Sequence, residues 1–442
     1  MNAQSLIKLP GLILFVMGLC FVFGYISFWL LAVFAVVGAV ASVFLFRPKF
    51  WNEDVPHAGA IVHIDAHMAV RPTILKHVPP DGYRLTCLYF GSGLIDRTTR
   101  LDHGFRYEVL DRIPALEGGC KPFDELCDRR AHEIVREARR RNAKINLLWS
   151  GGIDSTTACV ALMRASRDQP KQMRIFLSKE SRKEYPAFHK EHLNGQFELQ
   201  WIDNVGKAYR QDGLIVTGEL GDQIFGSAKA LEIQTQSLLR PTSEPFPGPL
   251  RKPWSDALYE QVRKRLASDV RAQAVLDYLT PQIETAPVAI DDLFTCLWWM
   301  NFSLKWQPVS LRMMGSAVGL SLTDFQSRTR HFFQTDDFQQ WALHHAGQGV
   351  REDWTTYKWA ARDYIYAFTG DDQYRRLKEK LPSLRGMMKP AVAFGALAIS
   401  ADGDLFWEKR DQSLKGPLAT EVGIEIEASR EAPLWDDLDD GE

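Results

Sequence analysis

The pattern of apolar and polar positions is most extreme at the beginning of the chain. Between Leu9 and Phe46 the sequence contains no charged residue. One helical membrane crossing needs about 20 apolar residues, so this run is long enough for two short spans. The pattern predicts a transmembrane helical hairpin over residues 1–50, with spans at Pro10 to Phe23 and Ile26 to Phe46.

The charges that flank this apolar run predict its orientation. Lys8 precedes it, and Arg47 and Lys49 follow it. Because positively charged flanks stay on the cytoplasmic side, we expect a membrane-anchored protein whose remaining chain is cytoplasmic. A cleaved signal peptide ending near Ala39 to Ala41 is the alternative. The apolar run is, however, much longer than the apolar region of about 7–15 residues in signal peptides.

The pattern then changes to short runs of β-forming residues separated by turns. GAIVHIDAHM, YRLTCLYFGSG and FRYEVLDRI are such runs, and they predict a small, mostly β region over residues 51–122. In the first run His63, Asp65 and His67 alternate, so they share one face of a strand. A metal site there is one interpretation, but we favour the solvent-facing side of a strand and predict no metal.

Residues 123–384 predict an α/β domain with a parallel sheet sandwiched by helices. A helix pattern over Phe123 to Arg141 leads into the apolar run KINLLWS, and another helix pattern follows Asp154. The apolar runs MRIFLS, FELQWID and GLIVTG then alternate with helix patterns such as KEYPAFHKEHL. Strands that are apolar throughout and alternate with helices are typical of a parallel sheet covered on both faces. From about residue 254 the spacing is helical.

The end of the chain predicts a hairpin followed by a tail. FGALAISADGDLFWEK reads as two strands around a turn, within a segment over residues 385–428. Residues 429–442 are acidic and poor in apolar residues, which indicates disorder.

Composition and charge narrow the function classes. The net charge of −2 gives no reason to expect nucleic-acid binding. The six cysteines include no C-x-x-C pair, which argues against a disulfide framework or a zinc ribbon and favours a reducing compartment.

The candidate chemistry begins in SGGIDS, which follows the strand KINLLW. A helix that starts after a parallel strand presents main-chain N–H groups that favour anions. Gly151 and Gly152 allow close approach of phosphate oxygens, and Ser150 and Ser155 add hydroxyl donors. Asp154 suits such a place if Mg²⁺ lies between its carboxylate and the phosphates.

Three motifs together resemble a known family. SGGIDS resembles the pyrophosphate-binding loop of N-type ATP pyrophosphatases. VTGELGDQIFGS (216–227) resembles the second acidic motif of the asparagine synthetase domain, and YKWAARDYI has the late K-x-x-x-R spacing of that family. SLRMMGSAVGLSL and FFQTDDFQQWAL are similar to further segments of the family. The resemblance covers about residues 123–384, in the family's order.

The resemblance implies an adenine nucleotide alpha hydrolase-like fold and Mg-ATP as the nucleotide. It implies an amide ligase that adenylates a carboxylate, releases pyrophosphate, and lets an amine or ammonia displace AMP. Asp154 and Asp222 would bind Mg²⁺, and Glu219, Lys358 and Arg362 would act in catalysis. The implied nucleotide-binding residues are Leu148 or its neighbour Leu147 at the adenine, and Ser150, Gly151, Gly152, Asp154, Ser155 and Gly218.

Departures from the family pattern limit these implications. Position 2 is Asn2, where glutamine-using asparagine synthetases have a catalytic cysteine, so we expect no glutaminase nucleophile. Ammonia would then come free or from a separate glutaminase or carrier partner. Leu220 stands where the pattern has glycine, and Gln223 where it has glutamate.

Two alternatives remain open. In the first, the protein is a nucleoside- or tRNA-modifying ATP pyrophosphatase, although nucleic acid is the less favoured partner. In the second, it is a non-catalytic nucleotide-binding membrane module. Retention of both Asp154 and Asp222 favours an enzyme.

Overall fold

The structure is a computed structural model that describes residues 61–62, 81–104, 107–239, 248–313, 322–351, 354–378, 395–399 and 405–409. The chain divides into two compact units, Met1–Pro56 and His57–Glu442, and the described residues all belong to the second. The predicted transmembrane hairpin, the His63, Asp65 and His67 set and the acidic tail lie outside the described residues. Among the residues that are described, no helix is both long enough and apolar enough to cross a membrane.

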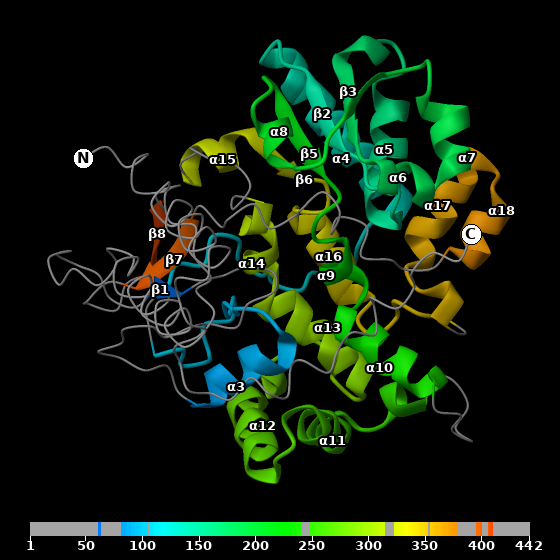
Figure 1. Ribbon diagram of the computed structural model, residues 1–442. Coiled ribbons are helices and arrows are strands. Elements are labelled where there is room, and N and C mark those ends of the chain that lie inside the picture. The colour runs from blue at the N-terminus through cyan, green and yellow to red at the C-terminus, as the bar shows by residue number, and fades with distance from the viewer. Residues whose placement is uncertain are drawn as a thin grey trace, which may run out of the picture. The chain divides into compact units, whose positions relative to one another are not determined.

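The centre of the unit is a five-stranded parallel sheet, as predicted for an α/β fold (Figure 1). The strand order is β4-β3-β2-β5-β6. The sequence predicted four of these strands and missed the fifth, β6. The strands are β2 (Ile145–Leu148), β3 (Met173–Leu177), β4 (Glu198–Trp201), β5 (Leu214–Thr217) and β6 (Thr329–His331).

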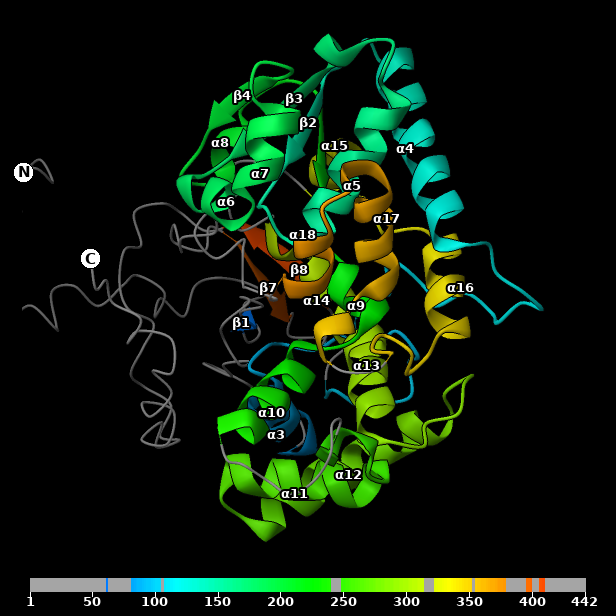
Figure 2. The ribbon, with the colours of Figure 1, turned by 90° about the vertical axis from the view of Figure 1, so that its right-hand side faces the viewer.

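Helices cover both faces of this sheet. On one face Leu147, Ile175 and Val216 join a core cluster that also contains residues of α4 (Phe123–Arg140) and α5 (Ile153–Ala165). On the other face the alternate strand residues share a second cluster with α8 (Gly206–Tyr209) and α15 (Leu322–Arg328). Burial on both faces explains why these strands are apolar throughout. Figure 2 shows α17 (Trp359–Thr369) alongside α5.

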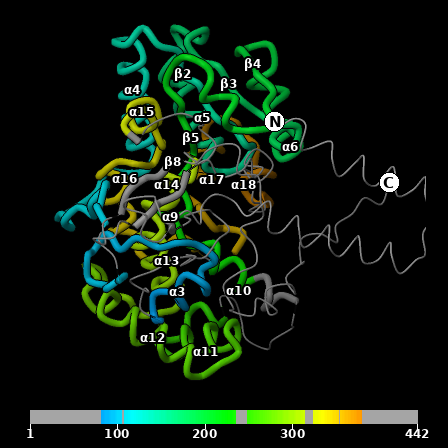
Figure 3. Tube along the Cα trace, turned by 60° about the vertical axis from the view of Figure 1, so that its left-hand side comes forward, coloured from blue at the N-terminus to red at the C-terminus, as the bar shows by residue number. Residues whose placement is uncertain are grey.

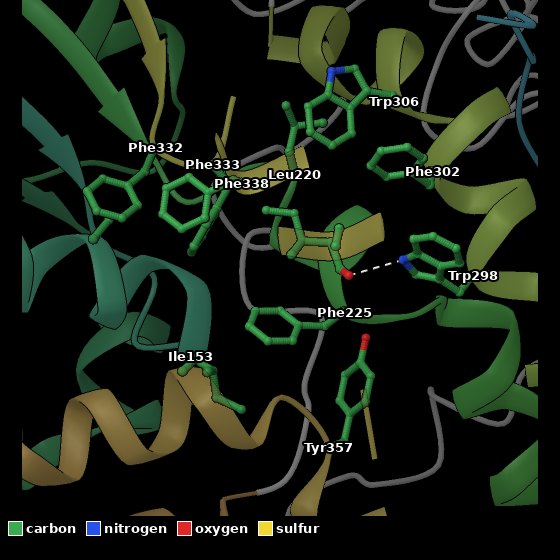
Figure 4. Packing of buried hydrophobic residues seen from close by; sticks show 14 of the residues in the cluster. Ile153, Leu220, Phe225, Trp298, Phe302, Trp306, Phe332, Phe333, Phe338 and Tyr357 are labelled. Atoms are coloured by element: carbon green, nitrogen blue, oxygen red, sulfur yellow. Dashed lines mark hydrogen bonds between the residues drawn. The ribbon is translucent and has the colours of Figure 1, made fainter. Parts of the chain in front are cut away.

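The second half is helical from α11, as predicted. Helix α13 (Leu293–Leu304) is buried over all twelve of its residues. A helix that is apolar all round belongs inside a core, and Figure 4 shows its Trp298 and Phe302 near Phe225 of α9 (Gly221–Phe225). The Trp298 Nε1–H donates to the Ile224 carbonyl oxygen at 3.0 Å, which fixes α9 against α13.

The remaining elements connect these parts. The predicted helix over KEYPAFHKEHL is present as three consecutive short pieces, α6, α7 and a π-helical turn. The elements not yet bounded are the 3₁₀ turn Pro170–Gln172, α6 (Lys179–Glu184), α7 (Pro186–Phe188), the π-helical turn His189–Leu193, α10 (Ala228–Leu239), the 3₁₀ turn Gly248–Arg251, α11 (Trp254–Leu266), α12 (Asp269–Glu284), α14 (Trp306–Leu311), α16 (Asp336–His344), the 3₁₀ turn Trp354–Thr356 and α18 (Asp372–Leu377).

The prediction of a mostly β region over residues 51–122 is wrong for the described residues between 81 and 122, which form no strand, whereas Ile61–Val62 do form a short strand. The run YRLTCLYF lies in helix α3 (Asp81–Phe90), and FRYEVLDRI forms no strand over its described residues 107–113. The buried residues Tyr83, Thr86, Cys87 and Phe90 recur at helical spacing and pack α3 onto α12. Tertiary packing therefore overrides the β preference of Tyr, Thr and Cys. Figure 3 shows α3, α11 and α12 grouped together.

The predicted C-terminal hairpin is confirmed at the level of the backbone. Strands β7 (Gly395–Ile399) and β8 (Leu405–Lys409) are antiparallel, with Ile399 opposite Leu405. A third strand, β1 (Ile61–Val62), pairs with β7.

The turn that enters β5 requires glycine at position 213. Gly213 has φ +121°, and a Cβ there would lie 2.4 Å from the Lys144 carbonyl oxygen. We therefore expect Gly213→Ala to destabilise the fold by about 2 kcal/mol and to lower the melting temperature. Gly119→Ala is the control, because among the described residues no heavy atom lies within 4 Å of its added Cβ. Equal melting temperatures for the two variants would contradict this account.

Candidate active site

The candidate site lies where the strand order reverses. From β2 the chain continues to β3 and β4 on one side, and then returns to place β5 and β6 on the other side. The loop after β2 and the loop after β5 therefore leave neighbouring strands at the same edge of the sheet. In open parallel sheets this reversal creates the crevice in which ligands bind.

The loop between β2 and α5 leaves no room for a side chain at Gly151. This residue has φ +80°, and an added Cβ would lie 2.4 Å from the Ser181 carbonyl oxygen. The hydroxyl oxygens of Ser150 and Ser155 lie 2.9 Å apart, and the Ser150 N–H donates to Ser155 Oγ at 3.1 Å. Gly152 precedes α5, and no described side chain caps this helix. The first turn of α5 thus has the character of an anion site.

The loop after β5 packs directly on this first turn. A Cβ at Gly218 would lie 2.6 Å from the Ser155 main-chain nitrogen. A Cβ at Gly221 would lie 2.3 Å from Cγ of the Asp154 carboxylate. The two glycines are therefore required for contact between the loops, and Gly218 has this packing role in addition to the predicted nucleotide role.

Both departures from the family pattern have a structural explanation. Leu220 stands at the position of a pattern glycine and has φ +71°, a conformation that costs a non-glycine residue about 1–2 kcal/mol. Its side chain is fully buried in the main core, which offsets that cost. Gln223 donates its amide N–H to Asn301 Oδ1 at 3.2 Å. Neither change removes a carboxylate from the cluster described next.

Lys358 joins the two predicted metal ligands. Its Nζ lies 2.7 Å from Asp222 Oδ1 and also contacts Asp154 Oδ2. The lysine side chain is 2% exposed, whereas those of Asp154 and Asp222 are 23% and 32% exposed. Burial lowers the pKa of Lys358, but the two carboxylates outweigh burial and hold the pKa above its ordinary value. The ammonium is therefore charged at neutral pH, beneath two carboxylates that solvent reaches.

The backbone at Lys358 is held in an uncommon conformation. Lys358 has φ +61°, and its N–H donates to the Gly349 carbonyl oxygen at 2.9 Å. Arg362 bonds the main-chain carbonyls of Tyr357 at 2.7 Å, Arg375 at 2.9 Å and Lys378 at 2.5 Å. The structure thus brings Lys358 to the carboxylates but directs the Arg362 guanidinium at main-chain oxygens. Arg362 positions the segment that carries Lys358.

Glu219 pairs with Arg312, a residue to which the sequence analysis assigned no role. Its carboxylate forms an ion pair with Arg312, and the Glu219 side chain is 1% exposed. Arg312 also interacts electrostatically with Asp222 and Asp154, so all five charged groups belong to one cluster. Arg312 is the arginine of SLRMMGSAVGLSL, and this segment was the one signal that pointed to it.

A buried histidine connects the two segments that carry the members of this ion pair. His331, at the end of β6, lies 2.7 Å from Thr217 Oγ1 through Nδ1, and its Nε2 lies 2.7 Å from the Ser310 carbonyl oxygen. Since a carbonyl only accepts, Nε2 carries the proton and Nδ1 accepts from Thr217. Thr217 Oγ1 accepts in turn from the Glu219 N–H at 3.1 Å. Sequence reasoning missed His331 because it missed β6.

The two leucines predicted near the adenine face opposite sides of the sheet. Leu148 belongs to the same core cluster as Phe176, in β3, and Ile202, which directly follows β4. Leu147 faces the opposite cluster with α5. Leu148 therefore shares a face of the sheet with Phe176 of β3.

The donor set suits Mg²⁺ only together with a phosphate ligand. Over the described ranges, no group of three or more His, Cys, Asp or Glu side chains is arranged to hold a metal. Asp154 and Asp222, however, already share one cation, the Lys358 ammonium. Mg²⁺ commonly takes one or two carboxylates and completes its shell with water and phosphate oxygens. The two aspartates therefore fit such an ion.

Two surface cavities lie away from this cluster. One, of about 750 Å³, is lined by residues that include Arg251, His344 and Arg351, and another, of about 960 Å³, lies beside Arg139 and Lys144. Neither is lined by the loop at 150–155. The assignment of the charged cluster therefore depends on its chemistry rather than on cavity size.

Comparison with known proteins adds no family assignment. No family model matches the chain, and no significant match was found among curated proteins.

The burial of His331 predicts that its imidazole stays neutral in mild acid. Burial, together with the charges of Arg312 and Arg130, lowers the pKa of His331 to about 4, although its bond to Ser310 opposes this shift. The unfolded chain takes up this proton near pH 6.5, so the contribution of His331 to stability is lost as pH falls from 6.5 to 4. NMR titration of the His331 ring, assigned with His331→Gln, should give a midpoint near pH 4. A midpoint near 6.5 would contradict the buried neutral assignment.

Proposed function

We propose that this protein is an ATP-dependent, AMP-forming amide ligase resembling the asparagine synthetase domain, with an adenine nucleotide alpha hydrolase-like fold. One observation carries the proposal. Asp154 and Asp222, from loops after two neighbouring parallel strands, share one cation beside a glycine loop and an uncapped helix start. This combination suits a nucleoside triphosphate with its divalent metal better than it suits a neutral ligand.

The binding roles follow from the positions of the groups. Main-chain N–H groups at the start of α5, together with the Ser150 and Ser155 hydroxyls, would bind the β- and γ-phosphates. Leu148 would contact the adenine. Asp154 and Asp222 would hold Mg²⁺, which, when bound, supplies neutralisation of phosphate charge.

The chemical roles follow from the charges. A substrate carboxylate oxygen attacks the α-phosphorus of ATP, and the bond from that phosphorus to the bridging oxygen of pyrophosphate breaks. Lys358, buried beside both aspartates, would stabilise the charge that develops on departing pyrophosphate. An amine or ammonia then attacks the acyl carbon, and AMP leaves. Glu219, held by Arg312 and Thr217, would lie by the acyl group and receive the amine proton.

We also propose that residues 1–50 anchor the protein in a membrane and leave the ligase domain in the cytoplasm. The uncharged run from Leu9 to Phe46 supports the anchor, and Lys8, Arg47 and Lys49 support the orientation. The substrates are a small carboxylic acid and an amine or ammonia. A separate glutaminase or carrier protein would be the partner that delivers ammonia.

The proposal predicts that AMP and pyrophosphate form when the full-length protein meets Mg-ATP, ammonia and a suitable member of a carboxylic acid panel. Asp154→Asn should lower this rate at least 100-fold, because it removes one of the two charges that would hold the metal. Removal of one electrostatic contact to a reacting group typically lowers the rate about 10²–10³-fold. Asp168→Asn is the matched control, since Asp168 is exposed and pairs only on the surface with Arg139.

Three outcomes separate the candidate functions. AMP formation that requires a carboxylic acid and is lost in Asp154→Asn supports the ligase. AMP formation that appears only with a nucleoside or tRNA contradicts the ligase and supports a nucleoside- or tRNA-modifying enzyme. ATP binding without any AMP indicates a non-catalytic module.

A further inference from the structure

The Lys358 ammonium occupies the position between Asp154 and Asp222 that a metal ligand set would surround. It contacts one oxygen of each carboxylate, at 2.7 Å for Asp222. The two carboxylates and the ammonium sum to a charge of −1. A divalent cation that binds the two aspartates without nucleotide must approach the Lys358 ammonium. It must also displace or share the contacts of that ammonium with Asp154 and Asp222.

The ammonium is fixed by the backbone beneath it. Three hydrogen bonds hold Lys358 at φ +61°. Its own N–H donates to the Gly349 carbonyl oxygen. The main-chain N–H of Arg362 donates to the Lys358 carbonyl oxygen at 3.0 Å, and Arg362 Nε donates to the Tyr357 carbonyl oxygen. A lysine rarely adopts this conformation, and the surrounding bonds impose it. The side chain is 2% exposed, so solvent does not offer the ammonium an alternative position.

The second cation of the cluster adds to this effect. Arg312 is paired with Glu219 and interacts with both Asp154 and Asp222. The charges of the two carboxylates that would bind a metal are therefore already partly compensated by Lys358 and Arg312. Their exposed side faces solvent, beside the loop that would hold phosphates.

We propose that Lys358 prevents Asp154 and Asp222 from binding a free divalent cation, and that metal and nucleotide bind this site as a coupled pair. The inference rests on the proposed function. The phosphates of ATP bring negative charge that both the ammonium and the metal can share, so that the repulsion between the two cations is offset only when nucleotide is present. Coupling of this kind is reciprocal: nucleotide strengthens metal binding by the factor by which metal strengthens nucleotide binding.

The test measures Mn²⁺ binding to the full-length protein by electron paramagnetic resonance, with Mn²⁺ alone and with α,β-methylene ATP. Wild type should bind Mn²⁺ alone weakly, and the nucleotide analogue should strengthen that binding about tenfold or more, within the usual range of coupling. Lys358→Gln removes the charge and should bind Mn²⁺ alone about tenfold more tightly, with the coupling reduced. Lys358→Arg keeps the charge and should resemble wild type.

Controls separate the possible failures. Lys207→Gln removes an exposed lysine that pairs with Asp203, and it should leave Mn²⁺ binding unchanged. Equal Mn²⁺ affinities of wild type and Lys358→Gln, without nucleotide, would overturn the proposal. If Lys358→Gln does not fold, the coupling in wild type decides, and coupling below threefold overturns the proposal. Absence of nucleotide binding in all proteins would refute the proposed function, while the nucleotide-free comparison still tests Lys358.

Discussion

The site depends on the close contact between the loop after β5 and the first turn of α5. A Cβ at Gly221 would overlap the Asp154 carboxylate, and one at Gly218 would overlap the main chain at Ser155. Because both positions are glycine, the two loops touch, and Asp222 reaches the same cation as Asp154. Without that contact the two carboxylates would lie farther apart, and Lys358 could not pair with both.

The rest of the unit holds this contact in place. Asn301 of α13 donates to the carbonyls of Asp222 at 3.0 Å and Gly226 at 2.7 Å, so the buried aromatic helix fixes α9 from below. Helix α17 packs on α5, and Lys358 is the residue that precedes its first turn. His331 links Thr217 to Ser310, close in sequence to Glu219 and Arg312. The charged groups thus come from α5, from the segment between β5 and the first turn of α9, from the end of α14 and from the start of α17, and these segments meet at the carboxyl edge of the sheet.

The sequence was sufficient for the parts of this arrangement that leave a local pattern. Apolar runs such as INLL and LIVT alternate with helix patterns, and this alternation predicted the parallel sheet. SGGIDS predicted a glycine loop at a helix start, because that function needs particular residues in consecutive positions. Lys358 followed from a spacing, and the structure does bring it to both aspartates.

The parts that the sequence did not reveal depend on contacts between distant segments. Strand β6 is three residues long and is defined by its pairing with β5, which no local pattern announces. YRLTCLYF prefers a strand locally but forms α3, because α12 covers one side of it. Arg362 has the spacing of a phosphate contact, yet its guanidinium bonds three carbonyls that only the folded chain brings near. The role of Arg312 required the same knowledge of its partner, Glu219.

The most direct test of the account is a structure of the full-length protein with Mg²⁺ and α,β-methylene ATP. The account predicts the β- and γ-phosphates at the main-chain N–H groups that begin α5, with one metal ion contacting both Asp154 and Asp222. Phosphates bound elsewhere, for example in the cavity lined by Arg251 and Arg351, would contradict the account and separate the charged cluster from nucleotide binding.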